Sequence, residues 1–249
     1  MALKRAWKRI CGQSLRILAV VHSSPENYKR RLHIRTKERR QSEARIRLEA
    51  NRYQDILQDD FIDTYKNLSY KSLMWLAFAG RECRSVPWLL KLDDDILVNV
   101  FSLTRHLEEL ERVGEAPEIL CNLWTGMEVL RDNASKWFVS QDEYPADVYP
   151  PYCSGSAYLL AGSLVPEMLV KAEQTSVLWV DDAFVTGLLI HNTSARCRPI
   201  NSLYNFDPSN TWTEMVEGEA VFGHVANWQL QERWRVWRGI LRKQGLIQA

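Results

Sequence analysis

Runs of apolar residues alternate with amphipathic stretches along this chain of 249 residues. Nearly continuous apolar runs at 15–24, 86–92 and 119–124 predict buried strands, because a strand covered on both faces loses the alternation of a half-exposed one. Apolar and small residues recur at helical spacing over 68–83, which predicts a helix. Strands that alternate with helices favour an α/β fold, with an open, mostly parallel sheet flanked by helices.

The same alternation continues in the second half of the chain. It predicts a strand at 156–162 and a helix at 163–174. Residues 177–190 are expected to run as a strand into an acidic pair and to continue as a helix. A short strand is expected within 220–227, and 228–245 has the spacing of an amphipathic basic helix.

Three consecutive aspartates follow the predicted strand at 86–92. Ligands bind at the carboxyl ends of strands in open α/β sheets, and an extended chain would place Asp93 and Asp95 on one side and Asp94 on the other. Carboxylate oxygens are the ligands that Mg²⁺ and Mn²⁺ prefer, often together with substrate phosphates. The alternative is a solvent-exposed acidic turn in which one aspartate caps the next helix.

A second acidic point and a histidine add to the candidate chemistry. One carboxylate of the Asp181–Asp182 pair would serve as a general base toward a hydroxyl group. The alternative is a pair that stabilises the positive end of the following helix. His224 lies between apolar residues, and its neutral imidazole would bind Mn²⁺, although a lone histidine is more often structural.

Aromatic residues gather in the loop-rich region 131–152. Trp137 and Phe138 are adjacent, and a run of tyrosines extends from Tyr144 to Tyr152. Because the C–H faces of sugars stack on aromatic rings, loops of this kind suit a carbohydrate ligand. Buried rings that anchor the loops are an equally good interpretation.

The charge distribution narrows the choice of partners only slightly. The net charge of +1 gives no overall argument for nucleic acid, and we expect no nucleic-acid partner. Fourteen of the 32 lysines and arginines lie within the first 48 residues, where they form either a solvated face or a surface for an anionic partner. No segment has the roughly 18 to 20 consecutive apolar residues that span a bilayer.

Five cysteines without a CxxC pair disfavour a structural zinc site. Cys83 and Cys153 flank predicted site elements and are one candidate disulfide pair, although the spacing does not fix the connectivity. N-x-S/T sequons at Asn67, Asn133 and Asn192 are a weak indication of the secretory pathway.

Six stretches together resemble the β-1,3-galactosyltransferase-like glycosyltransferases, a family that includes N-acetylglucosaminyltransferase and fringe relatives. In chain order they are "RRLHIRT" (30–36), "YQDILQDDFIDTYKNLSYKS" (53–72), "KLDDDILVN" (91–99), "KWFVSQDEYPADVYPPYCSG" (136–155), "VDDAFVTG" (180–187) and "FGHVAN" (222–227). They cover most of residues 15–230, and the second and third are long and specific to the family.

The resemblance implies a GT-A-like nucleotide-diphosphosugar transferase fold, with a UDP-sugar as donor and Mn²⁺ as cofactor. It implies transfer of galactose or an N-acetylhexosamine to a glycan hydroxyl on protein or lipid, with inversion and a β-1,3 linkage. Family members are type II proteins of the Golgi membrane that face the lumen. No signal or membrane-spanning segment is visible in this chain, so membrane association is expected from the family alone.

On this basis we expect a basic segment at 1–14 and a single glycosyltransferase domain over 15–249. The nucleotide half would span about 15–100 and the acceptor half about 101–230, followed by a C-terminal amphipathic helix at about 227–245. The basic segment lies outside the stretches that carry the resemblance.

The resemblance also assigns roles to particular residues. Asp93 and Asp95 would bind the metal, with Asp95 as the direct ligand and His224 as a second one. Asp182 would be the catalytic base beside Asp181. The donor side would comprise Arg31, Arg35, Lys71, Asp93 and Asp94, with Lys91 as a further diphosphate or structural partner. The acceptor side would comprise Trp137, Tyr144, Tyr152 and Gly155.

Three departures from the family pattern matter for function. Lys37 stands where the family usually has Trp, and Asp181-Asp182-Ala183 stands where it has Glu-Asp-Val. No apolar strand occurs between Thr36 and Gln54, and a missing strand would leave backbone unpaired and remove core. The alternative function is therefore a catalytically impaired relative that binds a UDP-sugar or a partner glycosyltransferase without turnover. A metal-dependent phosphoesterase or nucleotidyltransferase would need a second metal cluster or a nucleophile motif, and the sequence shows neither.

Overall fold

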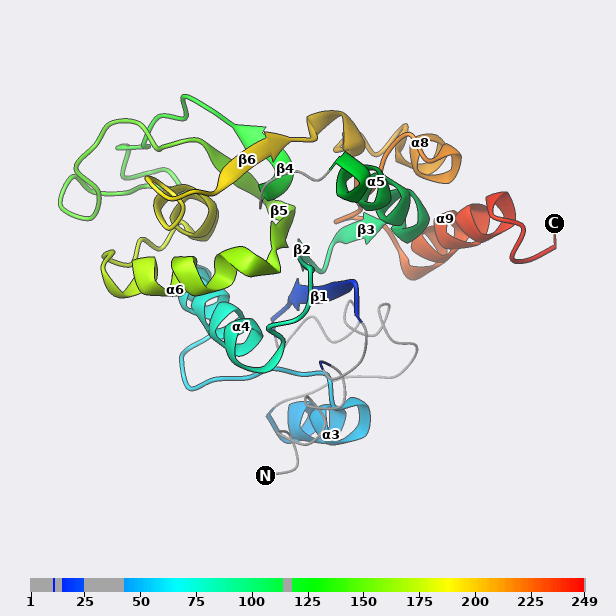
Figure 1. Cartoon of the computed structure of the whole chain (residues 1–249), viewed down its shortest axis with the longest axis horizontal. Coiled ribbons are helices and arrows are strands. Elements are labelled where there is room, and N and C mark those ends of the chain that lie inside the picture. The colour runs from blue at the N-terminus through cyan, green and yellow to red at the C-terminus, as the bar shows by residue number, and fades with distance from the viewer. Residues whose placement is uncertain (1–10, 12–14, 25–42, 114–117, 249) are drawn as a thin grey trace.

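A five-stranded sheet runs through the centre of the molecule, and helices lie against both of its faces (Figure 1). The computed structural model describes residue 11 and residues 15–24, 43–113 and 118–248. The basic start of the chain, apart from residue 11, and the stretch that holds Arg31 and Arg35 fall outside these residues. The roles predicted for the two arginines therefore stay predictions.

The strands of the large sheet follow the order β1-β2-β5-β4-β6. β1 (Ile17–His22) is parallel to β2 (Trp88–Asp93), and β4 (Glu118–Trp124) is parallel to β6 (Arg196–Pro199). β5 (Tyr152–Ala161) is antiparallel to both of its neighbours, β2 and β4. The predicted α/β class is confirmed, and the sheet is mixed: β1, β2, β4 and β6 run in one direction, whereas β5 runs through the middle of the sheet in the opposite direction.

The central strands are buried on both faces. On β2, Leu89 packs into the core on one face and Leu90 into the core on the other. Leu160 and Leu159 of β5 divide between the same two cores. The side chains thus keep the two-residue period of a strand while both faces are apolar, and the sequence therefore shows continuous hydrophobic runs.

α4 (Leu68–Glu82) and α6 (Val165–Glu173) cover one face of the sheet (Figure 1) and confirm the two helices predicted there. Gly80 lies where the helices meet. A Cβ atom at this position would come within 2.9 Å of Leu169 Cδ1 and 3.1 Å of Val165 Cγ1. A side chain at this position would force the Leu169 side chain to shift, so the glycine favours the close approach of α4 to α6.

α5 (Val100–Val113) and a small sheet with the order β3-β8-β7 cover the opposite face. The strands of the small sheet are β3 (Ile96–Val98), β8 (Phe222–His224) and β7 (Tyr204–Asn205). β3 follows β2 after a two-residue turn and pairs antiparallel with β8. This pairing brings the predicted histidine strand next to the aspartates that end β2.

α8 (Thr211–Glu217) and α9 (Leu230–Lys243) lie on the C-terminal side of the molecule (Figure 1). Val236 and Ile240 of α9 pack with Met215 of α8 in a third, smaller core. A capping box begins α9, which confirms the amphipathic helix predicted at this end. In the part of the chain that the structure describes, no helix has the length and apolar character needed to cross a bilayer.

β1 lies at one edge of the large sheet and pairs with β2 alone among the described strands. The next described element is α3 (Glu43–Tyr53), so the described part of the stretch from Thr36 to Gln54 holds a helix and no strand. One row of β1 peptide groups therefore has no strand partner in the described structure. Within the described residues, three short 3₁₀ helices connect the larger elements: η2 (Tyr65–Asn67), η3 (Gly162–Leu164) and η5 (Asn201–Leu203).

The strand predicted before the acidic pair is absent. Residues 177–180 are irregular and lead into α7 (Asp181–Ala183) and the π-helix η4 (Phe184–Leu188). Leu178 is buried, and its carbonyl accepts a hydrogen bond from Ser69 Oγ of α4 at 2.5 Å. The Ser69 hydroxyl therefore gives the Leu178 carbonyl the hydrogen bond that a neighbouring strand would otherwise provide. The run is apolar because it is buried, and for this reason its sequence resembles that of a strand.

The cysteine pairing differs from the Cys83–Cys153 pair considered from the sequence. Cys121 of β4 is bonded to Cys153 of β5, and Cys11 is bonded to Cys83 at the end of α4. β4 and β5 are neighbouring strands, and their two cysteine Cα atoms are 5.5 Å apart, within the range that a disulfide spans. Cys197 of β6 keeps a free thiol.

Candidate active site

Acidic side chains from two distant parts of the chain surround Lys91 at the carboxyl end of β2. Asp93 ends β2, Asp181 and Asp182 begin α7, and the Lys91 ammonium interacts electrostatically with all three carboxylates. Lys91 is only 2% exposed. Burial would lower its pKa, but the carboxylates, Asp93 first, outweigh burial and raise it above its ordinary value. Lys91 is therefore a buried cation among three acids.

The three consecutive aspartates have three different partners. The chain turns at Asp94 and Asp95, so strand alternation ends at Asp93. Lys91 Nζ lies 2.8 Å from Asp93 Oδ1, and Ser23 Oγ donates a hydrogen bond to Asp94 Oδ2 at 2.7 Å. Burial raises the pKa of Asp93, although Lys91 opposes that shift. Because of the turn, the carboxylates of Asp93 and Asp94 contact different residues.

Asp95 faces His224. Its Oδ2 atom lies 3.7 Å from His224 Nε2, and both side chains are partly exposed. Strand pairing sets this geometry, because Ile96 is opposite His224 and Val225 N–H donates to the Asp95 carbonyl at 2.8 Å. A carboxylate oxygen and an imidazole nitrogen this close could bind one divalent cation of the Mn²⁺ type.

Asp93 does not join this pair in the geometry of the structure. Across the described residues, no set of three ligand atoms that includes Asp93, Asp95 and His224 lies within 4.8 Å of one another. The Asp93 carboxylate is held by Lys91 instead. The residues present therefore fit a metal through Asp95 and His224, whereas Asp93 would reach the ion only through an intervening ligand or after a movement.

Asp182 is held by backbone on two sides. Its Oδ2 accepts a hydrogen bond from Gly155 N–H at 3.2 Å, and its Oδ1 accepts one from Ala183 N–H at 2.9 Å. Burial raises the pKa of Asp182, and it raises the pKa of Asp181 to about 6. A carboxylate that is fixed in place and has a raised pKa is a better proton acceptor than a solvated one.

Gly155 leaves little room for a side chain next to Asp182. A Cβ atom on Gly155 would lie 3.3 Å from both Cβ and Oδ2 of Asp182. A side chain here would push the Asp182 carboxylate away by a few tenths of an ångström, so glycine lets the β5 backbone approach closely enough to donate its N–H. Gly155 also accepts a hydrogen bond from Lys91 Nζ through its carbonyl.

Tyr152 and Tyr144 belong to one aromatic cluster beside the acidic pair. Tyr149 joins them, with ring centroids 5.2 Å from Tyr144 and 5.8 Å from Tyr152. Burial and the negative charge of Asp182 raise the pKa of Tyr152. Of the predicted acceptor residues, Gly155 thus contacts Asp182, the buried Tyr152 interacts with it electrostatically, and Tyr144 is linked to Tyr152 through Tyr149.

Trp137 precedes these tyrosines in the same loop region, and its side chain is half exposed. Its Nε1–H donates to Tyr65 Oη at 3.0 Å, and the Tyr65 ring lies 6.0 Å from the ring of Trp179, just before the acidic pair. Lys136 lies 4.2 Å from the centroid of the Tyr65 ring. Trp137 is therefore connected to the site by a chain of aromatic contacts and does not touch the carboxylates in any contact we describe.

Lys71 points from α4 toward the end of β1. It forms an ion pair with Asp63 at 2.5 Å and donates to the carbonyl of Ser23 at 3.4 Å. Ser23 in turn donates to Asp94, so Lys71 is one residue removed from the aspartate turn. This position is next to the strand end where the sequence places the donor.

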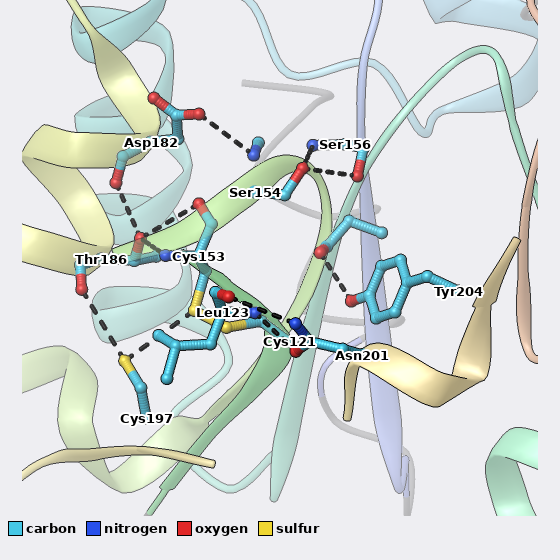
Figure 2. Close-up of a disulfide and its surroundings, with 12 residues drawn as sticks. Cys121, Leu123, Cys153, Ser154, Ser156, Asp182, Thr186, Cys197, Asn201 and Tyr204 are labelled. Carbon is cyan, nitrogen blue, oxygen red and sulfur yellow. Dashed lines mark hydrogen bonds between the residues drawn. A yellow bond between two sulfur atoms is a disulfide. The ribbon is translucent and has the colours of Figure 1, made fainter. Parts of the chain in front are cut away.

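Several supporting residues were missed by the sequence reasoning. Thr186 Oγ1 donates to the Asp182 carbonyl at 2.7 Å and accepts from Cys153 N–H at 2.9 Å, which ties η4 to β5 (Figure 2). Arg233 of α9 is buried and donates to the carbonyls of Asp94 and Val225 at 3.0 and 2.8 Å. Arg233 precedes the buried Val236 and Ile240 by three and seven residues, and this helical spacing could have shown that it lies on the buried face of α9.

One arginine organises the aromatic loop. Arg131 donates to four backbone carbonyls between 2.7 and 2.9 Å, those of Val139, Ser140, Tyr144 and Ala146. A guanidinium with several fixed donors suits this role. Nothing in the spacing of the sequence marks this arginine apart from its neighbours.

The fold and the site define an α/β protein with a carboxylate–imidazole pair and a partly buried acidic pair at one end of its central strands. The galactosyltransferase family model matches residues 34–200, about two thirds of the chain. The chain belongs to this family.

Two relatives illustrate the similarity. Human lactosylceramide 1,3-N-acetyl-beta-D-glucosaminyltransferase is 31% identical over 203 residues, which cover 70% of this chain and 53% of that protein. Chimpanzee (Pan troglodytes) beta-1,3-galactosyltransferase 5 is 34% identical over 165 residues, which cover 64% of this chain and 53% of that protein. The chain thus spans about half the length of the curated relatives it matches.

A solved structure was also compared with the chain. The crystal structure of a glycosyltransferase involved in the glycosylation of the major capsid of PBCV-1 covers 89% of this chain and 98% of its own, with a TM-score of 0.40 and 10% identity. A similarity of this size supports no conclusion about fold or function.

Proposed function

We propose that this protein is a metal-dependent inverting hexosyltransferase. It would move galactose or an N-acetylhexosamine from a UDP-sugar to a hydroxyl of an acceptor glycan on protein or lipid, with a β-1,3 linkage. The observation that carries the proposal is the placement of two kinds of group at one strand end. Asp95 and His224 suit a divalent cation, and Asp182 is held as a base by Gly155. Membership of the galactosyltransferase family supports the same reaction class.

In this mechanism Asp95 and His224 would hold Mn²⁺, which supplies positive charge to the leaving diphosphate when bound. Lys71 and Ser23 line the adjacent end of β1, on the donor side. Asp182 would remove the proton from the acceptor hydroxyl, whose oxygen then attacks the anomeric carbon from the face opposite UDP. Asp181 remains beside the base.

The acceptor would lie beside Asp182 and against the edge of the aromatic cluster, where Tyr144 is partly exposed and can stack on a sugar face, while the buried rings of Tyr149 and Tyr152 support it. We place the protein at the lumenal face of the Golgi membrane. Two disulfides support an oxidising compartment, since such bonds are rare in the cytosol.

The alternative is a relative that binds a UDP-sugar or a partner glycosyltransferase without turnover. The position of β1 favours it, because this strand has a single strand partner among the described residues and ends at the donor side of the site. An edge strand with one partner would be weakly held, and this would lower donor affinity first, because β1 ends at the donor side and is not in contact with Asp182 in the described structure.

The test is a screen of UDP-sugar donors and glycan acceptors with Mn²⁺, with UDP release and product linkage as readouts. Asp182→Asn should keep UDP binding and lower kcat at least 100-fold, because general-base catalysis contributes about 10²–10⁴. Asp95→Ala should abolish the metal dependence of UDP binding. Glu109→Gln, at an exposed position of α5, is the control and should match the wild type.

The outcomes separate the two functions. Metal-dependent UDP binding without release of UDP on any acceptor would favour the non-catalytic relative. Full turnover by Asp182→Asn would show that the base is another residue.

A further inference from the structure

Lys91 occupies a position where the other interior residues of its strand are apolar. Along β2, Leu89, Leu90 and Leu92 are buried in the two cores, and Lys91 is as buried as they are. A buried ammonium has a large desolvation cost unless its charge is compensated and its donors are satisfied. A leucine or methionine would fill the same space without that cost, so the partners of Lys91 indicate its use.

Those partners all belong to the candidate site. Lys91 Nζ donates to Asp93 Oδ1 at 2.8 Å and to the Gly155 carbonyl, and it lies 5.9 Å from the centroid of the Tyr158 ring. Strand register allows the Lys91 side chain to reach Gly155, because Lys91 is paired with Tyr158 on β5, three residues from Gly155. The ammonium thus connects the end of β2 to the start of β5.

Gly155 connects Lys91 to Asp182 through two hydrogen bonds. Its carbonyl is held by Lys91, and its N–H donates to Asp182 Oδ2 at 3.2 Å. The two bonds fix the peptide groups on either side of one glycine, a residue that otherwise has wide backbone freedom. Holding the Gly155 carbonyl therefore limits the directions in which its N–H can point.

We propose that Lys91 is a positioning residue, which holds the backbone of Gly155 so that Gly155 fixes the carboxylate of Asp182 for proton removal. This inference rests on the proposed function for its catalytic meaning, whereas the Lys91–Gly155–Asp182 linkage is a property of the folded protein. Lys91 need not touch either substrate in this role.

The linkage can be measured without turnover. Labelling with ¹⁵N-glycine gives one amide signal for each of the eleven glycines, and Gly155→Ala identifies the signal of Gly155 by its loss. Asp182→Asn should shift this signal because it changes the acceptor of the N–H. Lys91→Met should shift it as well and speed its hydrogen exchange at least about tenfold, because the carbonyl restraint is lost.

Kinetics then tests the catalytic meaning. Lys91→Met should lower kcat about 10- to 100-fold with a donor KM within about threefold of the wild type, and Lys91→Arg should restore part of the loss by keeping a cationic donor. Lys171→Met, a lysine of α6 for which we describe no side-chain contact, is the matched control and should change neither readout. If Lys91→Met does not fold, Lys91→Gln replaces it, with smaller changes expected in the same directions.

The results separate the two proposals. A Gly155 signal that does not move in Lys91→Met overturns the positioning role, whether or not kcat falls. Wild-type kcat in Lys91→Met overturns it too. If the wild-type protein transfers no sugar, the proposed function fails, and the Gly155 signal alone still decides whether Lys91 holds the backbone beside Asp182.

Discussion

Asp181 shows how burial changes the behaviour of a single carboxyl group. Its pKa is raised to about 6, chiefly by burial and against the attraction of Lys91. A carboxyl with a raised pKa in the folded state opposes folding when it is ionised. This penalty is absent below the unfolded pKa of about 4 and is complete once the pH exceeds about 6.

We therefore expect Asp181→Asn to stabilise the protein by about 2–3 kcal/mol at pH 8, since each unit of pKa corresponds to about 1.4 kcal/mol. At pH 4 the variant and the wild type should have nearly equal free energies of unfolding. Urea denaturation at the two pH values measures the difference. Asp142→Asn, at an exposed position, should have no effect at either pH. A gain that is equal at both pH values would contradict the role of ionisation.

Residue types and spacing identified the acidic residues and the histidine as candidates, but they did not identify the residues that position these side chains. Asp95 and His224 were predicted from their chemistry, and strand pairing places them 3.7 Å apart. The separation of Asp93 from that pair could not be predicted, because it depends on a turn at Asp94 and on a buried lysine. Partners that lie far apart in sequence are set by the fold rather than by local pattern.

At the scale of elements, α9 is tied to the aspartate turn by one buried arginine. Arg233 donates to the carbonyls of Asp94 and Val225, and α9 also packs on α8 and, through Trp237, on Phe101 of α5. Removal of this guanidinium would take two charge-assisted hydrogen bonds from a buried region, and the Val225 carbonyl would keep only the Trp228 N–H as a donor. The C-terminal helix is therefore part of the support of the site.

Arg233→Met should lower the free energy of unfolding by about 2–4 kcal/mol, the range for two lost charge-assisted hydrogen bonds to buried acceptors. Arg238→Met, on an exposed position of the same helix, should change it by less than about 0.5 kcal/mol. Urea unfolding of both variants provides the comparison. Equal effects of the two substitutions would show that burial of Arg233 contributes nothing beyond a lost surface charge.

Helices were easier to predict than strand directions. The spacing over 68–83 became α4, and the runs at 86–92 and 119–124 became β2 and β4. Continuous apolar runs do not reveal orientation, so the antiparallel β5 was missed. They also do not separate a strand from a buried irregular segment, which is why 177–180 was predicted wrongly.

At the scale of the whole molecule, two disulfides connect regions that are far apart in the chain. Cys121–Cys153 closes a loop of 32 residues between neighbouring strands, and Cys11–Cys83 joins segments 72 residues apart. A cross-link that closes a loop of this size lowers the entropy of the unfolded chain, which in the chain-entropy model stabilises the fold by about 4 kcal/mol for each disulfide.

Peptide mapping by mass spectrometry under non-reducing conditions should recover both pairs, with Cys197 carrying the alkylating label only after unfolding. Burial raises the pKa of the Cys197 thiol to about 11, so little reactive thiolate exists at pH 8. Cys121→Ser should lower the free energy of unfolding by about 3 kcal/mol. A recovered Cys83–Cys153 peptide would contradict the arrangement of the strands.

The segment that matches the galactosyltransferase family ends at residue 200, but the candidate site does not. His224 and Arg233 follow it, and Ser23 precedes it. A chimera that exchanges residues 34–200 with a relative would therefore import a new Asp95 and Asp182 while keeping the old histidine, the old arginine and the old edge of the sheet. Donor preference would then be inherited from two parents at once, so specificity in this protein should be transplanted with its C-terminal helix included.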